Sequence, residues 1–87
     1  MPYQVAILPV ALRQLNALDR TVRVRIRNRI DALAENPRPH GAKALRGDVD
    51  TLRLRVGDHR ILYRVEDRQL VVLVITVGHR REVYRRR

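Results

Sequence analysis

Apolar and basic side chains largely alternate between Leu52 and Arg64, on both sides of a Gly57-Asp58 dipeptide, and this pattern limits the possible folds more than any other. Successive side chains of a β-strand point to opposite faces of a sheet, so the apolar residues share one face and most of the arginines the other. Glycine supplies the positive φ that a two-residue turn requires. The pattern therefore predicts a β-hairpin with strands over residues 52–56 and 59–65.

A two-residue turn also fixes which residues of the hairpin stand opposite each other. The predicted pairs are Leu52 with Tyr63, Leu54 with Ile61, and Arg55 with Arg60. Like charges directly opposite each other destabilise a sheet, so we expect an anionic partner at the arginine pair. The alternative is a solvated face of arginines that reflects only an arginine-rich composition.

The residues before the hairpin predict one strand and two helices. Residues 3–7 alternate as a short strand does, and Pro9 suits the first turn of a helix. Asp19 is a favourable N-cap for a second helix, which two prolines and a glycine end within residues 36–41. The predicted apolar stripes comprise Leu12, Leu15 and Leu18 in the first helix, and Val22, Ile26, Ile30 and Leu33 in the second.

Leu70–Val77 is apolar on both faces and rich in β-branched residues, which predicts a buried central strand. Residues 66–69 form a polar turn before it. The expected fold class is α+β with the order β-α-α-β-β-β, in a single domain over residues 1–87. An N-terminal helical hairpin packs on one face of an antiparallel sheet, and the open face carries Arg53, Arg55 and Arg60.

The charge balance of the chain indicates the kind of partner. Nineteen basic residues stand against nine acidic ones, and the formal net charge of +10 favours a polyanion such as nucleic acid. The absence of cysteine fits a reducing compartment, so we expect a cytoplasmic protein. The three histidines lack the close spacing of a zinc site, and no apolar run is long enough to span a bilayer.

The residues after Leu70–Val77 suggest chemistry on a phosphodiester. If that strand is central, it brings His79, Arg80 and Arg81 towards the arginine pair of the hairpin, and Tyr84 follows. Guanidinium groups bind two phosphate oxygens at once and stabilise the charge that builds up at phosphorus. Arginine stays protonated, so Tyr84 and His79 are the titratable candidates. The simpler alternatives are that Tyr84 packs at the sheet edge and that His79 is an exposed loop residue.

Three segments together resemble the RelE/ParE toxin superfamily, and more particularly its RelE branch: Lys43–Gly47, Leu52–Tyr63 and Val77–Tyr84. The resemblance covers almost the entire chain. It implies the toxin of a type II toxin–antitoxin module, with a fold like that of small microbial RNases. Toxins of the RelE type cut mRNA in the ribosomal A site by attack of the 2′-hydroxyl, and a cognate antitoxin wraps and suppresses them.

The resemblance also implies roles for individual residues. Arg60 matches an arginine that contacts the scissile phosphate, and Arg80 one that stabilises the phosphate or acts as an acid. Tyr84 matches a tyrosine that stacks on the nucleotide and serves as a proposed base. The expected catalytic residues are Arg55, Arg60, Arg80 and Tyr84, and the expected RNA-binding residues are Arg46, Arg53, His79 and Arg81.

One departure from the family pattern affects the chemistry. Arg53 and Arg55 stand where the best-known members carry two lysines, and an arginine essentially cannot lose its proton. Acid–base chemistry in this chain must then use Tyr84 or His79. We expect no cofactor and no metal. The expected partners are an antitoxin, with a toxin–antitoxin hetero-oligomer as one form of the assembly, and mRNA on the ribosome, without a membrane.

Two other functions fit the same sequence. A ParE-like toxin of the same fold poisons DNA gyrase, and a non-catalytic module would bind RNA or the ribosome through its arginines alone. The presence of both Arg80 and Tyr84 favours the RelE branch, because neither alternative needs these two residues for its chemistry.

Overall fold

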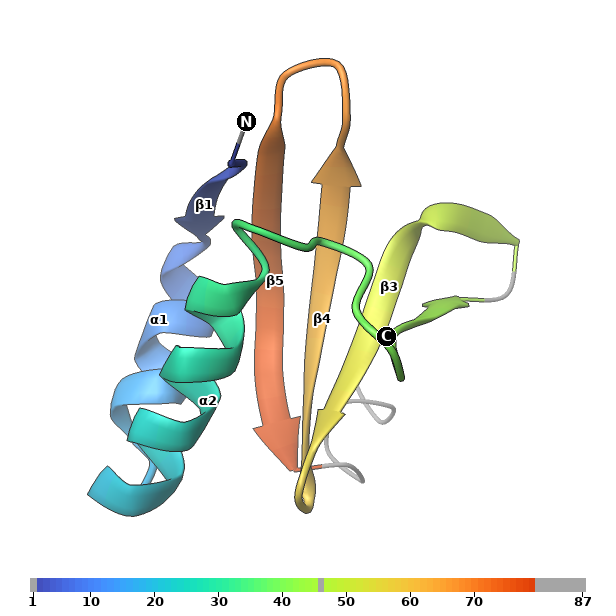
Figure 1. The fold of residues 1–87 in the computed structure, drawn as a ribbon. Coiled ribbons are helices and arrows are strands. Elements are labelled where there is room, and N and C mark those ends of the chain that lie inside the picture. The colour runs from blue at the N-terminus through green and yellow to red at the C-terminus, as the bar shows by residue number, and fades with distance from the viewer. Residues whose placement is uncertain (1, 46, 80–87) are drawn as a thin grey trace.

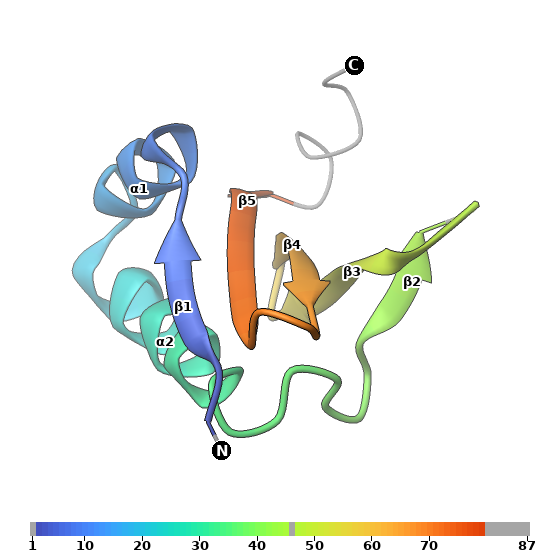
Figure 2. The same cartoon turned by 90° about the horizontal axis from the view of Figure 1, so that it is seen from above.

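The computed structural model of the chain describes residues 2–45 and 47–79, which form two helices and five strands (Figure 1). In chain order these elements are β1 (Gln4–Ile7), α1 (Pro9–Asn16), α2 (Arg20–Ala32), β2 (Lys43–Leu45), β3 (Asp48–Val56), β4 (His59–Glu66) and β5 (Val71–His79). The strands form one sheet in the order β1-β5-β4-β3-β2, which Figure 2 shows from above. The predicted α+β class is confirmed.

Three details of the predicted topology are wrong. β1 pairs with β5 in parallel, so the sheet is mixed rather than antiparallel. β2 was not predicted, because three residues are too few to show a period. β5 is an interior strand, but β4 is the central one. Periodicity identifies a strand and its buried face, whereas partner and direction depend on how the whole chain packs.

The predicted hairpin is confirmed in its register. Leu52 is paired with Tyr63, Leu54 with Ile61, and Arg55 with Arg60. Gly57 has the positive φ of 61° that the two-residue turn requires. β3 is longer than expected, since it begins at Asp48.

The hydrophobic core lies on one face of the sheet. Tyr63 and Ile61 are 0% exposed and pack with Ile26 and Ile30 of α2. The phenol of Tyr63 donates a hydrogen bond to the carbonyl oxygen of Pro37 at 2.7 Å, and burial raises its pKa to about 12. The buried sheet residues are Leu52, Leu54, Val56, Ile61, Tyr63, Val65, Val72, Val74 and Val77.

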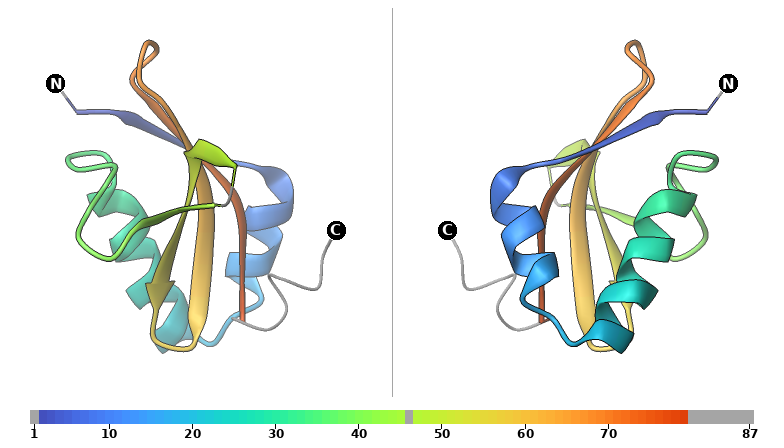
Figure 3. Two further views of the ribbon diagram at one scale, coloured as in Figure 1. Left: turned by 90° about the vertical axis from the view of Figure 1, so that its right-hand side faces the viewer. Right: turned by 90° about the vertical axis from the view of Figure 1, so that its left-hand side faces the viewer.

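Both helices contribute to this core, through Ala11 and Leu15 of α1 and Ile26 and Ile30 of α2. α2 lies over the core face, whereas α1 runs alongside β5 beyond the end of β1, so that the two helices flank the strands in Figure 3. The Gln14 side chain of α1 bonds to the strand itself. Its Oε1 accepts hydrogen bonds from the amide of Val77 and the hydroxyl of Thr76, each at 2.8 Å. α1 thereby replaces a strand neighbour at this part of the sheet edge.

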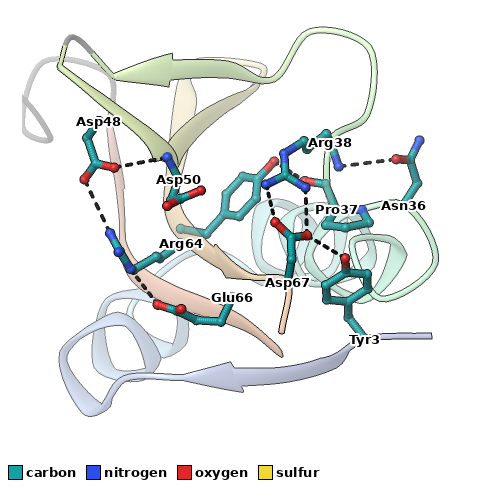
Figure 4. Close-up of polar contacts among 10 residues, drawn as sticks. Tyr3, Asn36, Pro37, Arg38, Asp48, Asp50, Arg64, Glu66 and Asp67 are labelled. Carbon is teal, nitrogen blue, oxygen red and sulfur yellow. Dashed lines mark hydrogen bonds and ion pairs between the residues drawn. The ribbon is translucent and has the colours of Figure 1, made fainter. Parts of the chain in front are cut away.

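A polar network fixes the loop that leads from α2 to β2 (Figure 4). The Asp67 carboxylate accepts hydrogen bonds from Arg38 at 3.1 and 2.9 Å and from the Tyr3 hydroxyl at 2.7 Å. Together, Arg38 and Tyr3 lower the pKa of Asp67 to about 2. The network joins the N-terminus, the loop and the β4–β5 turn. The network therefore fixes the position of the loop that leads to Gly41 and Lys43.

Candidate phosphate-binding site

Three of the predicted arginines meet in one pocket on the face of the sheet opposite the core. Arg53, Arg55 and Arg60 line a cavity of about 120 Å³ together with Gly41 and Lys43. These arginines alternate along β3 and β4 with side chains that are buried in the core. The two-residue period of the strands therefore places them together on the opposite face.

The strand pairing determines how the four cations of the pocket are arranged. Lys43 on β2 stands opposite Arg53 on β3, and Arg55 on β3 stands opposite Arg60 on β4. Gly78 on β5 is the partner of Arg60 and contributes no side chain to this face. The positive charge thus extends across three adjacent strands.

The surroundings of the pocket suit an anion. Among the described residues that line it, none is acidic. The Nε of Arg60 is buried, and a charge that is shielded from water interacts more strongly with an anion. The Nε of Arg55 donates to the carbonyl oxygen of Gly57 at 3.4 Å, which directs this exposed side chain along the turn. The arrangement can hold a phosphate oxygen from more than one side.

His79 does not join this pocket. It pairs with His59 across β5 and β4, and the two rings meet edge to face with their centroids 5.8 Å apart. They line a second cavity of about 350 Å³, together with Gln14, Ala17, Leu18, Val77 and Gly78. His79 thus lies beside α1, separate from Arg53 and Arg55.

Some of the predicted site lies outside the described residues. Arg46, Arg80, Arg81 and Tyr84 belong to this part of the chain, and their roles stay predictions. Sequence reasoning missed Gly41 and Lys43 as members of the pocket. The Lys43–Gly47 segment was a signal for Lys43, but its pairing with Arg53 depends on the unpredicted strand β2.

Residues 2–45 and 47–79 contain no group of three or more His, Asp or Glu side chains that could hold a metal ion. Neither described helix has the length and apolar character needed to cross a membrane.

The chain is similar in sequence to known toxins. Residues 5–84 match the family model for the ParE toxin of the type II toxin–antitoxin system parDE. Toxin RelG of Mycobacterium tuberculosis is 32% identical over 87 residues, which cover 99% of this chain and 100% of that protein. The mRNA interferase toxin RelE of Escherichia coli is 38% identical over 78 residues, which cover 85% of this chain and 81% of that protein.

The chain also superposes on solved structures of toxins. A double arginine-to-alanine variant of Escherichia coli RelE in the free state superposes with a TM-score of 0.82 at 32% identity, covering 98% of this chain and 93% of that one. The toxin–antitoxin complex RelBE2 of Mycobacterium tuberculosis contains a chain that superposes with a TM-score of 0.80 at 29% identity, covering 92% of this chain and 100% of that one.

Proposed function

Because the chain belongs to the RelE/ParE superfamily of toxins from type II toxin–antitoxin systems, we propose that it inhibits translation as a ribosome-dependent endoribonuclease that cleaves mRNA in the A site. The pocket of Arg53, Arg55, Arg60 and Lys43 carries this proposal, because it offers a phosphodiester several cationic donors on an accessible face. The relatives named RelE support the substrate.

In the proposed reaction the RNA supplies its own nucleophile. The 2′-oxygen attacks phosphorus and loses its proton to a base, while the bond from phosphorus to the 5′-oxygen breaks. The departing 5′-oxygen takes up a proton, and the products are a 2′,3′-cyclic phosphate and a 5′-hydroxyl. Arg55 and Arg60 stabilise the charge that develops on the phosphate oxygens. This route needs positioning, cations and proton transfer, so we propose that it is independent of metal.

The position of His79 narrows the choice of proton-transfer groups. Because His79 lies in the second cavity, beside α1, we assign proton transfer to Tyr84. Arg80 would stabilise the charge on the leaving oxygen, and Tyr84 would orient the nucleotide and take up the 2′-proton. Both assignments follow the family resemblance of the Val77–Tyr84 segment.

Toeprinting on programmed ribosomes tests the proposal. The purified chain is added to ribosomes that hold an mRNA and have an empty A site. A primer annealed to the mRNA is then extended by reverse transcription. We expect a new stop within the A-site codon, with less or no cleavage of the same mRNA when it is free. Intact mRNA in the presence of folded protein would reject the proposed activity.

A second candidate function follows from the family model, whose description is that of a ParE toxin. A ParE-like toxin would trap DNA gyrase on DNA and would leave ribosome-bound mRNA intact. A gyrase cleavage assay on supercoiled plasmid distinguishes the two. If the plasmid becomes linear after gyrase is denatured with detergent, and toeprinting shows no cleavage of mRNA, the ParE-like function replaces the endoribonuclease.

We also propose a cognate antitoxin as the partner of the chain. Structural relatives include toxin–antitoxin complexes from Escherichia coli, Mycobacterium tuberculosis and Pyrococcus horikoshii. The basic pocket of this chain offers an acidic segment a ready binding surface.

A further inference from the structure

The cavity between α1 and the ends of β4 and β5 has no role in the proposed function. It measures about 350 Å³ and has the size and mixed lining of small-ligand sites. Ala17, Leu18 and Val77 provide apolar walls, while Gln14, His59 and His79 provide polar edges and aromatic rings. Unstacked RNA bases bind in such places by stacking on rings, imidazole included, and by hydrogen bonds to their edges.

Gln14 gives this cavity a hydrogen-bond donor of fixed direction. The amide of Val77 is a donor only, so the Gln14 atom that meets it at 2.8 Å must be the oxygen. The hydroxyl of Thr76 donates to the same oxygen at 2.8 Å. The Gln14 oxygen is thus occupied twice, and among the described residues no acceptor meets the Gln14 NH₂ group, so that group can donate to a ligand. The cavity is therefore suited to a base that presents a carbonyl oxygen or ring nitrogen as acceptor.

The cavity lies directly behind the arginine pocket. His59 and Arg60 are consecutive on β4 and project to opposite faces, and Gly78 and His79 are their partners on β5. Because the two side chains point to opposite faces, a phosphate on Arg60 and a base beside His59 lie on opposite sides of the sheet, near the same ends of β4 and β5. To reach both sites, the RNA must bend around the ends of β4 and β5, which would splay the base beside His59 out of its stack.

We propose that the cavity of Gln14, His59 and His79 is a base-binding subsite for the RNA whose phosphate lies in the arginine pocket. The inference rests on the proposed function, because RNA in that pocket is what brings a base to the cavity. The subsite contributes to the choice of sequence at one position through the place of the acceptor on the base edge, since all four bases carry an acceptor but not at the same position. Arg60, in contrast, contacts phosphate and serves every sequence equally.

Nuclear magnetic resonance of the three histidines tests the subsite directly. The probe is a trinucleotide with 2′-O-methyl groups, which cannot be cleaved because the 2′-oxygen has no proton to lose. Stacking of a base should shift the ring proton signals of His59 and His79. His40 is exposed in the loop before β2 and serves as the control within the same spectrum.

Three variants separate stacking from hydrogen bonding. His79→Ala should weaken trinucleotide binding roughly 5- to 100-fold, the range for loss of one base stack, whereas His79→Phe keeps a ring and should retain most of the affinity. Gln14→Glu still accepts from Val77 and Thr76 but exchanges the donor for an acceptor. It should change the ratio of cleavage among A-site codons, while Arg60→Ala should lower cleavage of all codons alike.

The outcomes distinguish this subsite from the proposed function. If the trinucleotide binds in an Arg60-dependent way but the ring proton signals of His59 and His79 do not shift, the subsite is overturned and the cleavage proposal stays intact. Shifted signals without any cleavage on ribosomes would support the subsite and overturn the cleavage proposal. No binding at millimolar trinucleotide, or an unchanged codon ratio in Gln14→Glu, would count against the subsite.

Discussion

At the scale of single residues, the pocket differs from a lysine-based site in the chemistry that it permits. The pocket has three arginines, Arg53, Arg55 and Arg60, and planar guanidinium groups bind two oxygens at once. They can therefore stabilise a phosphate, but they are poor at exchanging protons with it. Lys43 is the one described residue of the pocket with an amine, and it stands opposite Arg53.

Arg60 should be essential for cleavage and dispensable for folding. Its side chain projects from the face opposite the core, between the buried Ile61 and the half-buried His59. Arg60→Ala should lower the cleavage rate by about 10²–10³, which is typical for loss of one charge-stabilising donor. Quantitative toeprinting measures this rate, and circular dichroism checks the fold.

Arg68 provides the matched control for Arg60. It is an exposed arginine in the β4–β5 turn, at the opposite end of β4 from Arg60. Arg68→Ala removes the same charge from the molecule and should leave cleavage near the wild-type rate. Equal losses in the two variants would mean that overall charge, rather than a phosphate contact at Arg60, determines activity.

Tyr84 should contribute through both its ring and its hydroxyl. Tyr84→Phe keeps the stacking surface and removes the proton-transfer group, so it should retain more activity than Tyr84→Ala. Arg80→Ala should be severely impaired under the proposed mechanism. The measurement is cleavage on programmed ribosomes together with growth arrest after induction. A Tyr84→Ala toxin that still arrests growth while trapping gyrase would show that the chain belongs to the ParE branch.

At the scale of elements, the hairpin was the most predictable part of the molecule. The alternation of Leu54 and Arg55, together with Gly57, was enough to give the strands, the turn and the register, and hence the face on which the arginines lie. Asp19 stands at the predicted N-cap of α2, although its side chain makes no capping hydrogen bond. Local pattern determined these features, since each depends on residues close together in the chain.

Other features depend on contacts between distant residues and could not be predicted. The register shifts between Leu62 and Tyr63, whose partners are Thr76 and Val74, so β5 contains one extra residue. This bulge allows Val74 and Val77 both to reach the core. Gln14 is equally invisible to pattern analysis, because nothing in its surroundings in the sequence shows that it will bond to β5.

The Asp67 network should make stability depend on pH in the acid range. The ordinary pKa of an aspartate is about 3.9. Arg38 and Tyr3 lower the pKa of Asp67 to about 2. The ionised group is thus favoured in the folded state, so its contribution is present above about pH 4 and is lost as the pH falls towards about 2.

Thermal unfolding of Asp67→Asn as a function of pH tests this expectation. The variant should have a lower Tm than wild type at neutral pH, and the difference should shrink towards pH 2. Asp31→Asn is the control, because Asp31 forms only an exposed pair with Arg27 at 3.6 Å, and such pairs contribute little. A constant Tm difference across this pH range would exclude ionisation of Asp67 as the cause.

At the scale of the whole molecule, charge is unevenly distributed. Asp67 binds Arg38, and Asp48 and Glu66 bind Arg64, so these acids are engaged with arginines away from the pocket. The pocket itself has no acidic residue among its described lining. The pocket therefore offers a partner with an acidic segment a place to bind, and a disordered segment that folds on binding could wrap so small a protein.

The antitoxin proposal predicts a stabilising neighbour in the genome. We expect the adjacent open reading frame to encode a small protein with an acidic or amphipathic C-terminal segment. Its co-expression should restore growth, and its binding should raise the Tm of this chain, because a ligand that binds only the folded state stabilises it by about 2.7 kcal/mol at 100 times its Kd.

Growth assays and thermal unfolding of the purified complex check this prediction. A chain that is harmless when expressed alone, with no neighbouring product that binds it, would favour the passive RNA-binding module over a toxin.

The parallel pairing of β1 with β5 has a consequence for how the chain is made. Gln4 stands in register with Val71, so the first strand to leave the ribosome must wait for the last described one before that side of the sheet can close. Contacts between such distant residues also slow folding. During synthesis the unfinished chain therefore has the arginines of β3 and β4 before it has the closed sheet that supports them. The complete sheet, and with it the complete toxin fold, exists only after β5 has emerged, because the order of synthesis delays this pairing.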